Sequence, residues 1–139
     1  MKTFRLILLL ALFIPIIGLS QTNKNKSETT STEKIEAYYF HNTSRCVTCK
    51  TVEAEAKQDI ETLYPDLVKQ GKMSFKALNL EEESGKIIAN KLGVSGQTLL
   101  LVKGEQKIDI TNEGFLYART NPAKLKTIIK EKIDRLLVL

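Results

Sequence analysis

Two cysteines, Cys46 and Cys49, are the residues whose type and spacing point most directly to chemistry. They are the only cysteines among 139 residues, and two residues separate them. Such a pair can alternate between a disulfide and two thiols, and it exchanges with another disulfide through a mixed-disulfide intermediate. We predict that Cys46 is the exposed nucleophile and that Cys49 is the more buried thiol, which resolves the intermediate.

The residues around the pair predict a helix that begins at the first cysteine. Helix-forming residues run from Cys46 to about Leu63, after a predicted strand that ends at Phe40. A sulfur at a helix start lies beside unpaired N–H groups and the positive end of the helix dipole, and both favour the thiolate. Arg45 and Lys50 are expected to add positive charge nearby, as modulators of the thiols.

Two other interpretations of the pair stay open. An inert structural disulfide is one, although so short a loop gains little entropic stabilisation from a cross-link. A copper or zinc carrier is the other, with His41 as a third ligand, although closed zinc sites use four ligands. His41 could instead accept a proton from Cys49, or lie at the loop surface bonded to backbone. Dithiol redox chemistry without a cofactor or resident metal is favoured.

The pattern of apolar residues predicts a single α/β domain with the order βαβαββα. Alternating strands and helices predict a central sheet covered by helices on both faces, in which only the last hairpin need be antiparallel. We expect Val47, Ile87 and Leu137 on buried helix faces, and residues 115–117 in the core rather than on a docking surface. The expected strands are 35–40, 72–80, 98–102 and 106–110, and the expected helices are 46–63, 81–92 and 122 onwards.

The N-terminal residues predict export. Lys2 and Arg5 precede an unbroken apolar run from Leu6 to Ile17, and small residues lead to a cleavage site after Ser20. The run is too short for a membrane-spanning helix, which needs about 20 apolar residues. We therefore expect a signal peptide at 1–20, a flexible linker at 21–33 and a folded domain at 34–139, periplasmic or otherwise exported. The alternative is an uncleaved anchor that leaves the domain on the outer face.

The charge balance argues against a nucleic-acid-binding protein. Lysine and arginine total 21 against 16 acids, a formal charge of +5. Removing Lys2 and Arg5 with the signal peptide leaves 19 against 16, or +3. So small an excess, with lysines and glutamates interleaved, is typical of a solvated surface.

Several sequence segments resemble the thioredoxin-like superfamily over about residues 34–139. They are the strand YYF, the motif CVTCK, the strand LLLVKG after GVSG, and the amphipathic C-terminal helix. The resemblance implies disulfide exchange at Cys46 and Cys49 with a protein disulfide or a reductase partner. It also implies electrons from a membrane conduit of the cytochrome-c-biogenesis type.

A narrower resemblance rests on YYFHNTSRCVTCK, VSGQTLLLVKG and FLYARTNPAKLK. These segments are similar to the small exported thioredoxin-like subunits of nitrophenyl-compound (aromatic arsenical) nitroreductase systems. That likeness implies a role in the reduction of nitroaromatic arsenicals.

The chain departs from the usual thioredoxin pattern at four places around the cysteines. Arg45 stands where thioredoxins usually carry tryptophan, and Val47-Thr48 replaces Gly-Pro. Gln97 and Thr98 occupy the strand start that usually carries a cis-proline, and we predict that they form the substrate-docking edge. The strand at 37–40 lacks the buried acid that assists proton transfer in many thioredoxins, so another base or water must serve.

Overall fold

The computed structural model describes residues 33–138. The expected signal peptide at 1–20 lies outside the described residues, as does the expected linker at 21–33 apart from its last residue. Among residues 33–138, no helix combines the length and apolar character needed to cross a bilayer.

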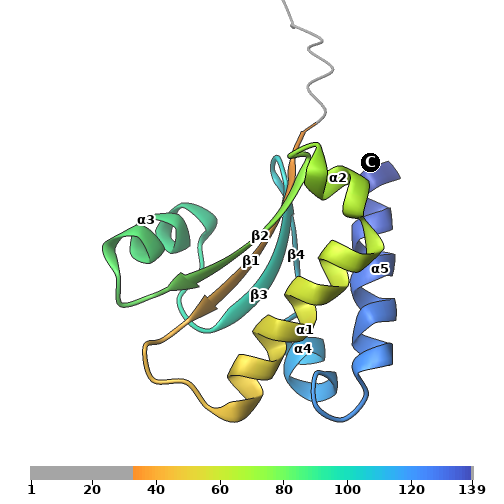
Figure 1. The fold of residues 1–139 in the computed structure, drawn as a ribbon. Coiled ribbons are helices and arrows are strands. Elements are labelled where there is room, and N and C mark those ends of the chain that lie inside the picture. The colour runs from red at the N-terminus through yellow and green to blue at the C-terminus, as the bar shows by residue number, and fades with distance from the viewer. Residues whose placement is uncertain (1–32, 139) are drawn as a thin grey trace, which may run out of the picture.

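Four strands form one mixed sheet in the order β2-β1-β3-β4 (Figure 1). β1 (Ile35–His41) pairs in parallel with β2 (Met73–Asn79) and antiparallel with β3 (Thr98–Lys103), which pairs antiparallel with β4 (Gln106–Asp109). The prediction that only the last hairpin is antiparallel was wrong. β2 ends and β3 begins at the same end of the sheet, beside the end of β1, so β3 must run back along its neighbour.

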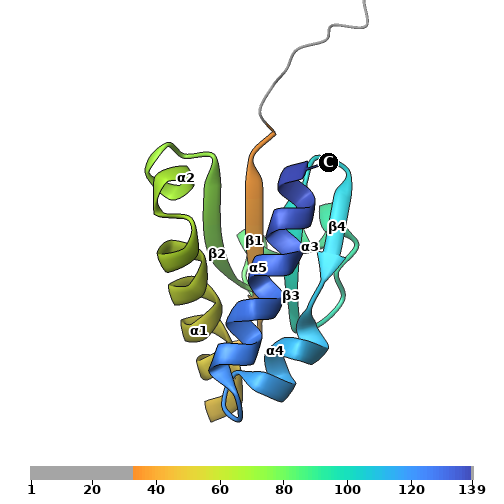
Figure 2. The same cartoon turned by 90° about the vertical axis from the view of Figure 1, so that its right-hand side faces the viewer.

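The helices cover both faces of the sheet, as the α/β prediction requires (Figure 1, Figure 2). α3 (Glu83–Leu92) lies alone on one face. The helices on the other face are α1 (Val47–Leu63), α2 (Pro65–Lys69), α4 (Thr111–Tyr117) and α5 (Pro122–Val138). The βαβαββα order is confirmed, with the short helices α2 and α4 added to it.

Two apolar clusters, one on each face, hold the sheet between the helices. The adjacent strand residues Tyr38 and Tyr39 are both buried and belong to different clusters, because successive side chains of a strand point to opposite faces. Tyr39 lies in the larger cluster, which α1 and α5 cover, and Tyr38 in the smaller one under α3. The larger cluster thus lies on the face of the sheet that carries the helix with the cysteines.

Four apolar side chains that were expected to be buried are exposed. Val47 is 68% exposed, Ile87 58%, Leu116 58% and Leu137 43%. In each helix, neighbouring small or apolar residues face the sheet instead; in α1 these are Val52, Ala56 and Ile60. The predictions for these four residues were wrong because a helix buries only one stripe of its surface.

Candidate functional site

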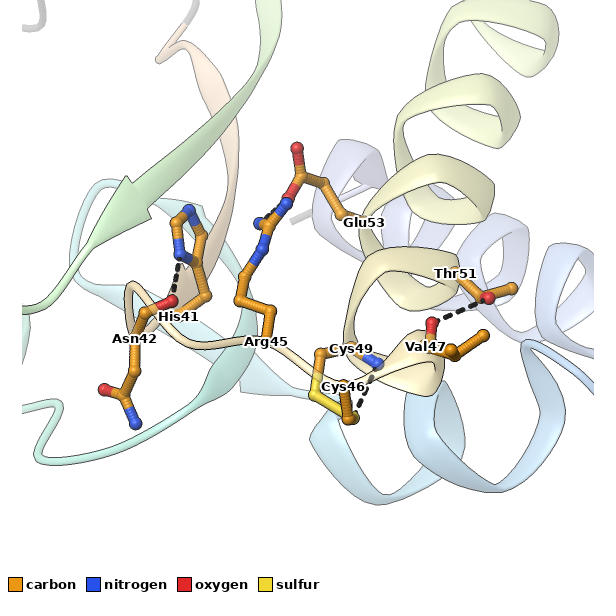
Figure 3. The surroundings of a disulfide bond; sticks show 8 residues. All are labelled: His41, Asn42, Arg45, Cys46, Val47, Cys49, Thr51 and Glu53. Atoms are coloured by element: carbon orange, nitrogen blue, oxygen red, sulfur yellow. Dashed lines mark hydrogen bonds and ion pairs between the residues drawn. A yellow bond between two sulfur atoms is a disulfide. The ribbon is translucent and has the colours of Figure 1, made fainter.

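Cys46 and Cys49 form a disulfide where α1 begins, at the end of the sheet that carries the C-terminal end of β1 (Figure 3). Their Cα atoms are 5.2 Å apart. Cys46 is the N-cap residue of α1, with extended backbone, and its Sγ accepts a hydrogen bond of 3.1 Å from the backbone N–H of Cys49. The sulfur therefore takes the place of the oxygen that usually caps a helix, beside the positive end of the helix dipole.

The two cysteines differ sharply in their access to solvent. Cys46 is exposed, whereas Cys49 is only 4% exposed. Val47, which follows the first cysteine, is exposed as well. Of the two cysteines, Cys46 is therefore the one that is open to solvent, and Cys49 lies inside.

An ion pair joins Arg45, the residue before Cys46, to Glu53 on α1. The Arg45 Nη1 donates a hydrogen bond to Glu53 Oε2, and the two side chains are 19% and 27% exposed. Glu53 follows Cys49 by four residues on α1, so the two side chains share one helix face. Glu53 compensates the charge of Arg45, and the expectation that Arg45 modulates the thiols stays a prediction. Sequence reasoning missed Glu53, although its helical spacing from Cys49 was a usable signal.

His41 is the half-buried last residue of β1, and its ring is bonded to backbone rather than to the cysteines. Its Nδ1 lies 3.0 Å from the carbonyl oxygen of Asn42, and its ring lies on the far side of Arg45 from the sulfurs (Figure 3). Within the described part of the chain, no group of three or more His, Cys, Asp and Glu side chains is placed to hold a metal ion. The structure therefore does not bring His41 together with the two cysteines.

Tyr39 is the buried polar neighbour of the ion pair. Its hydroxyl has no hydrogen-bond partner among the described residues. The pKa of Tyr39 is raised to about 12, mainly by burial. The charge of Glu53 adds to this rise by a smaller amount, and the charge of Arg45 opposes it. The hydroxyl therefore stays protonated at neutral pH and cannot act as a base for the thiols.

Gln97 and Thr98 lie at the same end of the sheet as the disulfide. Thr98 pairs with Phe40 of β1, and its hydroxyl donates to the carbonyl of Gly96 at 3.0 Å. The pairing of β3 with β4 runs from Leu100 to Lys103, so Thr98 lies beyond it. Every peptide bond in the described residues is trans, including those at this strand start.

The mixed sheet, the helices on both faces and the cysteine pair at the start of the first helix are the features that the sequence resemblance implies. The fold is thioredoxin-like. No protein-family model matches the chain, and no curated protein matches it. Among solved structures, the chain is similar to oxidized thioredoxin O2 from Arabidopsis thaliana, at 19% identity over 71% of this chain and 75% of that one, with a TM-score of 0.49. It is also similar to a malarial protein, at 15% identity over 62% of this chain and 93% of that one, with a TM-score of 0.41.

Proposed function

We propose that this protein is a thiol-disulfide oxidoreductase that uses Cys46 and Cys49. The observation that carries the proposal is the disulfide at the start of α1, in which Cys46 is an exposed residue and Cys49 a buried one. The N–H of Cys49 that now bonds the Cys46 sulfur would also stabilise a thiolate there. Cys46 would therefore attack and leave as the exposed thiolate, and Cys49 would resolve the intermediate.

The reduction of the disulfide balances in two steps. A thiolate of a dithiol donor attacks the Cys46 sulfur, the bond between the two cysteines breaks, and Cys49 leaves as a thiolate that takes up a proton from water. The second thiolate of the donor then attacks the mixed disulfide and releases Cys46. The donor leaves as a disulfide, and two electrons have passed to the protein. The reduced pair reduces a client disulfide by the same steps in reverse.

The setting and partners of this chemistry are further parts of the proposal. The N-terminal sequence supports export, and the superfamily resemblance supports a membrane electron donor. The narrower resemblance supports a reductase partner that acts on nitroaromatic arsenicals. Gln97 and Thr98, at the disulfide end of the sheet, would contact an extended client segment.

Serine variants of the two cysteines test the proposal. Dithiothreitol reduces insulin disulfides slowly by itself, and the wild-type protein should accelerate the reaction. Cys46→Ser should abolish this acceleration. Cys49→Ser should retain the attacking thiol and accumulate a mixed disulfide, because nothing resolves it. Non-reducing electrophoresis and mass spectrometry of cells that express each variant would show the trapped partner.

The same variants test the inert-disulfide and metal-carrier alternatives. If the disulfide is inert, the double Cys→Ser variant complements a deletion strain and neither single variant traps a partner. If the protein carries copper or zinc, reduced protein retains metal through desalting and the double variant loses it. Either result, without insulin reduction, would overturn the proposed function.

A further inference from the structure

We infer that Glu53 is a positioning residue for the disulfide: by holding Arg45 in a neutral ion pair, it limits how strongly the Cys46 thiolate is favoured. The inference rests on the proposed function only in taking the cysteine pair to be redox-active. It concerns an equilibrium property of that pair, and it adds Glu53 to the site.

The geometry ties the charge of Arg45 to α1 rather than to the sulfur. Arg45 directly precedes Cys46, yet its guanidinium points to Glu53, one helical turn beyond Cys49 (Figure 3). Both side chains are largely buried, so solvent screens their interaction less than it would at the surface. Without this acceptor, the guanidinium would be free to turn toward a thiolate on Cys46, the next residue in the chain.

Other charged or titratable groups lie on the elements that flank the loop before α1. The Oε1 of Glu81 accepts a hydrogen bond of 3.2 Å from the backbone N–H of Thr43, in the loop that carries Arg45. Lys50 on α1 is exposed, and His41 at the end of β1 is bonded to backbone. Glu113 of α4 is half-buried and adjoins Gly114, which packs against Val52 of α1. Among the described residues, two ion pairs involve the elements that carry the sulfurs: Arg45 with Glu53, and Asp59 of α1 with Lys126 of α5. The first lies nearer to the cysteines along α1.

The two halves of the pair therefore have opposite expected effects. Glu53→Gln leaves the arginine charge uncompensated beside Cys46, so we expect the pKa of the Cys46 thiol to fall by about one unit. At a pH above that pKa, the reduced form gains up to about tenfold, which is about 30 mV in the potential of the couple. Arg45→Met leaves the carboxylate uncompensated, so the pKa should rise and the potential should become more negative.

The test compares the wild-type protein with Glu53→Gln, Arg45→Met and the double variant. The reduced proteins are used for the pKa measurement. Thiolate absorbance against pH gives the pKa of Cys46, and equilibration with glutathione gives the potential. Because Glu53 acts through Arg45, the shift caused by Glu53→Gln should shrink at least twofold in the Arg45→Met background. Arg45→Lys, which keeps the charge, should stay nearer to wild type than Arg45→Met.

Glu61→Gln is the matched control. It removes the same charge from an exposed position of α1 that lies about 22 Å along the helix from Cys46, beyond the Debye length. It should change neither the pKa nor the potential.

Three results would overturn the inference. Equal shifts in both backgrounds would show that Glu53 acts on the sulfur directly. No shift in any variant would show that the pair does not influence the thiolate. A slower exchange in Glu53→Gln with an unchanged pKa would make Glu53 a proton acceptor for Cys49. All three readouts are independent of insulin reduction and partner trapping, so the inference and the proposed function can fail separately.

Discussion

Asp59 is the buried charged residue among the described residues, at 3% exposure on α1. Its Oδ1 lies 3.7 Å from the Nζ of Lys126 on α5, and its Oδ2 has no hydrogen-bond partner among the described residues. Burial raises the pKa of Asp59, and Lys126 offsets only part of that effect. The folded state therefore disfavours the ionised form relative to the unfolded chain, at a position far along α1 from the cysteines.

Asp59→Asn should stabilise the protein at neutral pH. A group whose pKa is raised on folding lowers the free energy of unfolding as pH rises through its pKa, and the deficit persists above it. Removing the charge should raise Tm at pH 7 by about 5 °C, for a gain of about 1 kcal/mol. Thermal unfolding of variant and wild type between pH 8 and pH 4 should show the difference shrinking as pH falls.

Glu61→Gln, on the same helix but exposed, serves as the control for this effect. It should leave Tm within about 2 °C of wild type at every pH. A destabilised Asp59→Asn protein at pH 7 would show instead that the contact with Lys126 outweighs the cost of burial.

At the site, the sequence could predict local chemistry but not the side-chain partners. The place of Cys46 at a helix start follows from spacing and composition alone. The pairing of Arg45 with Glu53 depends on how the loop before α1 turns. The contact of the His41 ring with backbone depends on where β1 ends. The periodic pattern of apolar residues in the sequence predicts neither of these contacts.

At the scale of elements, the first turn of α3 lies unusually close to the end of β2. A Cβ at Gly85 would lie 1.9 Å from the carbonyl oxygen of Asn79, which is backbone and cannot rotate away. Gly85→Ala should therefore destabilise the protein by about 2 kcal/mol, which is about 10 °C in Tm. Thermal unfolding monitored by circular dichroism would measure the loss.

Gly96→Ala is the matched control, because a Cβ there would meet nothing within 4 Å. Its Tm should stay close to that of wild type. If Gly85→Ala were equally harmless, β2 and α3 would be able to move apart without cost.

The elements that periodicity missed are the short ones. α2 is a short helix that starts at Pro65, two residues after the expected end of the helix at 46–63. Proline suits the first turn of a helix as well as the break before it. α4 spans seven residues around Gly114, too few to show a repeating apolar stripe. The direction of β3 depended on where the chain leaves α3, which the order of elements does not specify.

At the scale of the whole molecule, the disulfide should contribute little to stability. It closes a loop of four residues, for which the chain-entropy relation gives about 2 kcal/mol. Reduction should therefore lower Tm by about 10 °C at most and leave the protein folded. Thermal unfolding with and without dithiothreitol measures the difference.

The double Cys→Ser variant provides the control, since dithiothreitol should not change its Tm. If reduction unfolded the wild-type protein, the disulfide would be needed to maintain the fold. That result would contradict a redox role for Cys46 and Cys49.

The outer strands of the sheet bear on how the protein behaves in concentrated solution. β2 and β4 each leave one side of their backbone without a strand neighbour among the described residues. β4 is four residues long and carries Lys107 and Asp109, and Lys76 lies on β2. A short edge strand such as β4 and a charged side chain on an edge strand such as Lys76 both discourage copies from joining edge to edge into continuous aggregates. Copies of the protein should therefore stay separate along these two strands even when the solution is crowded.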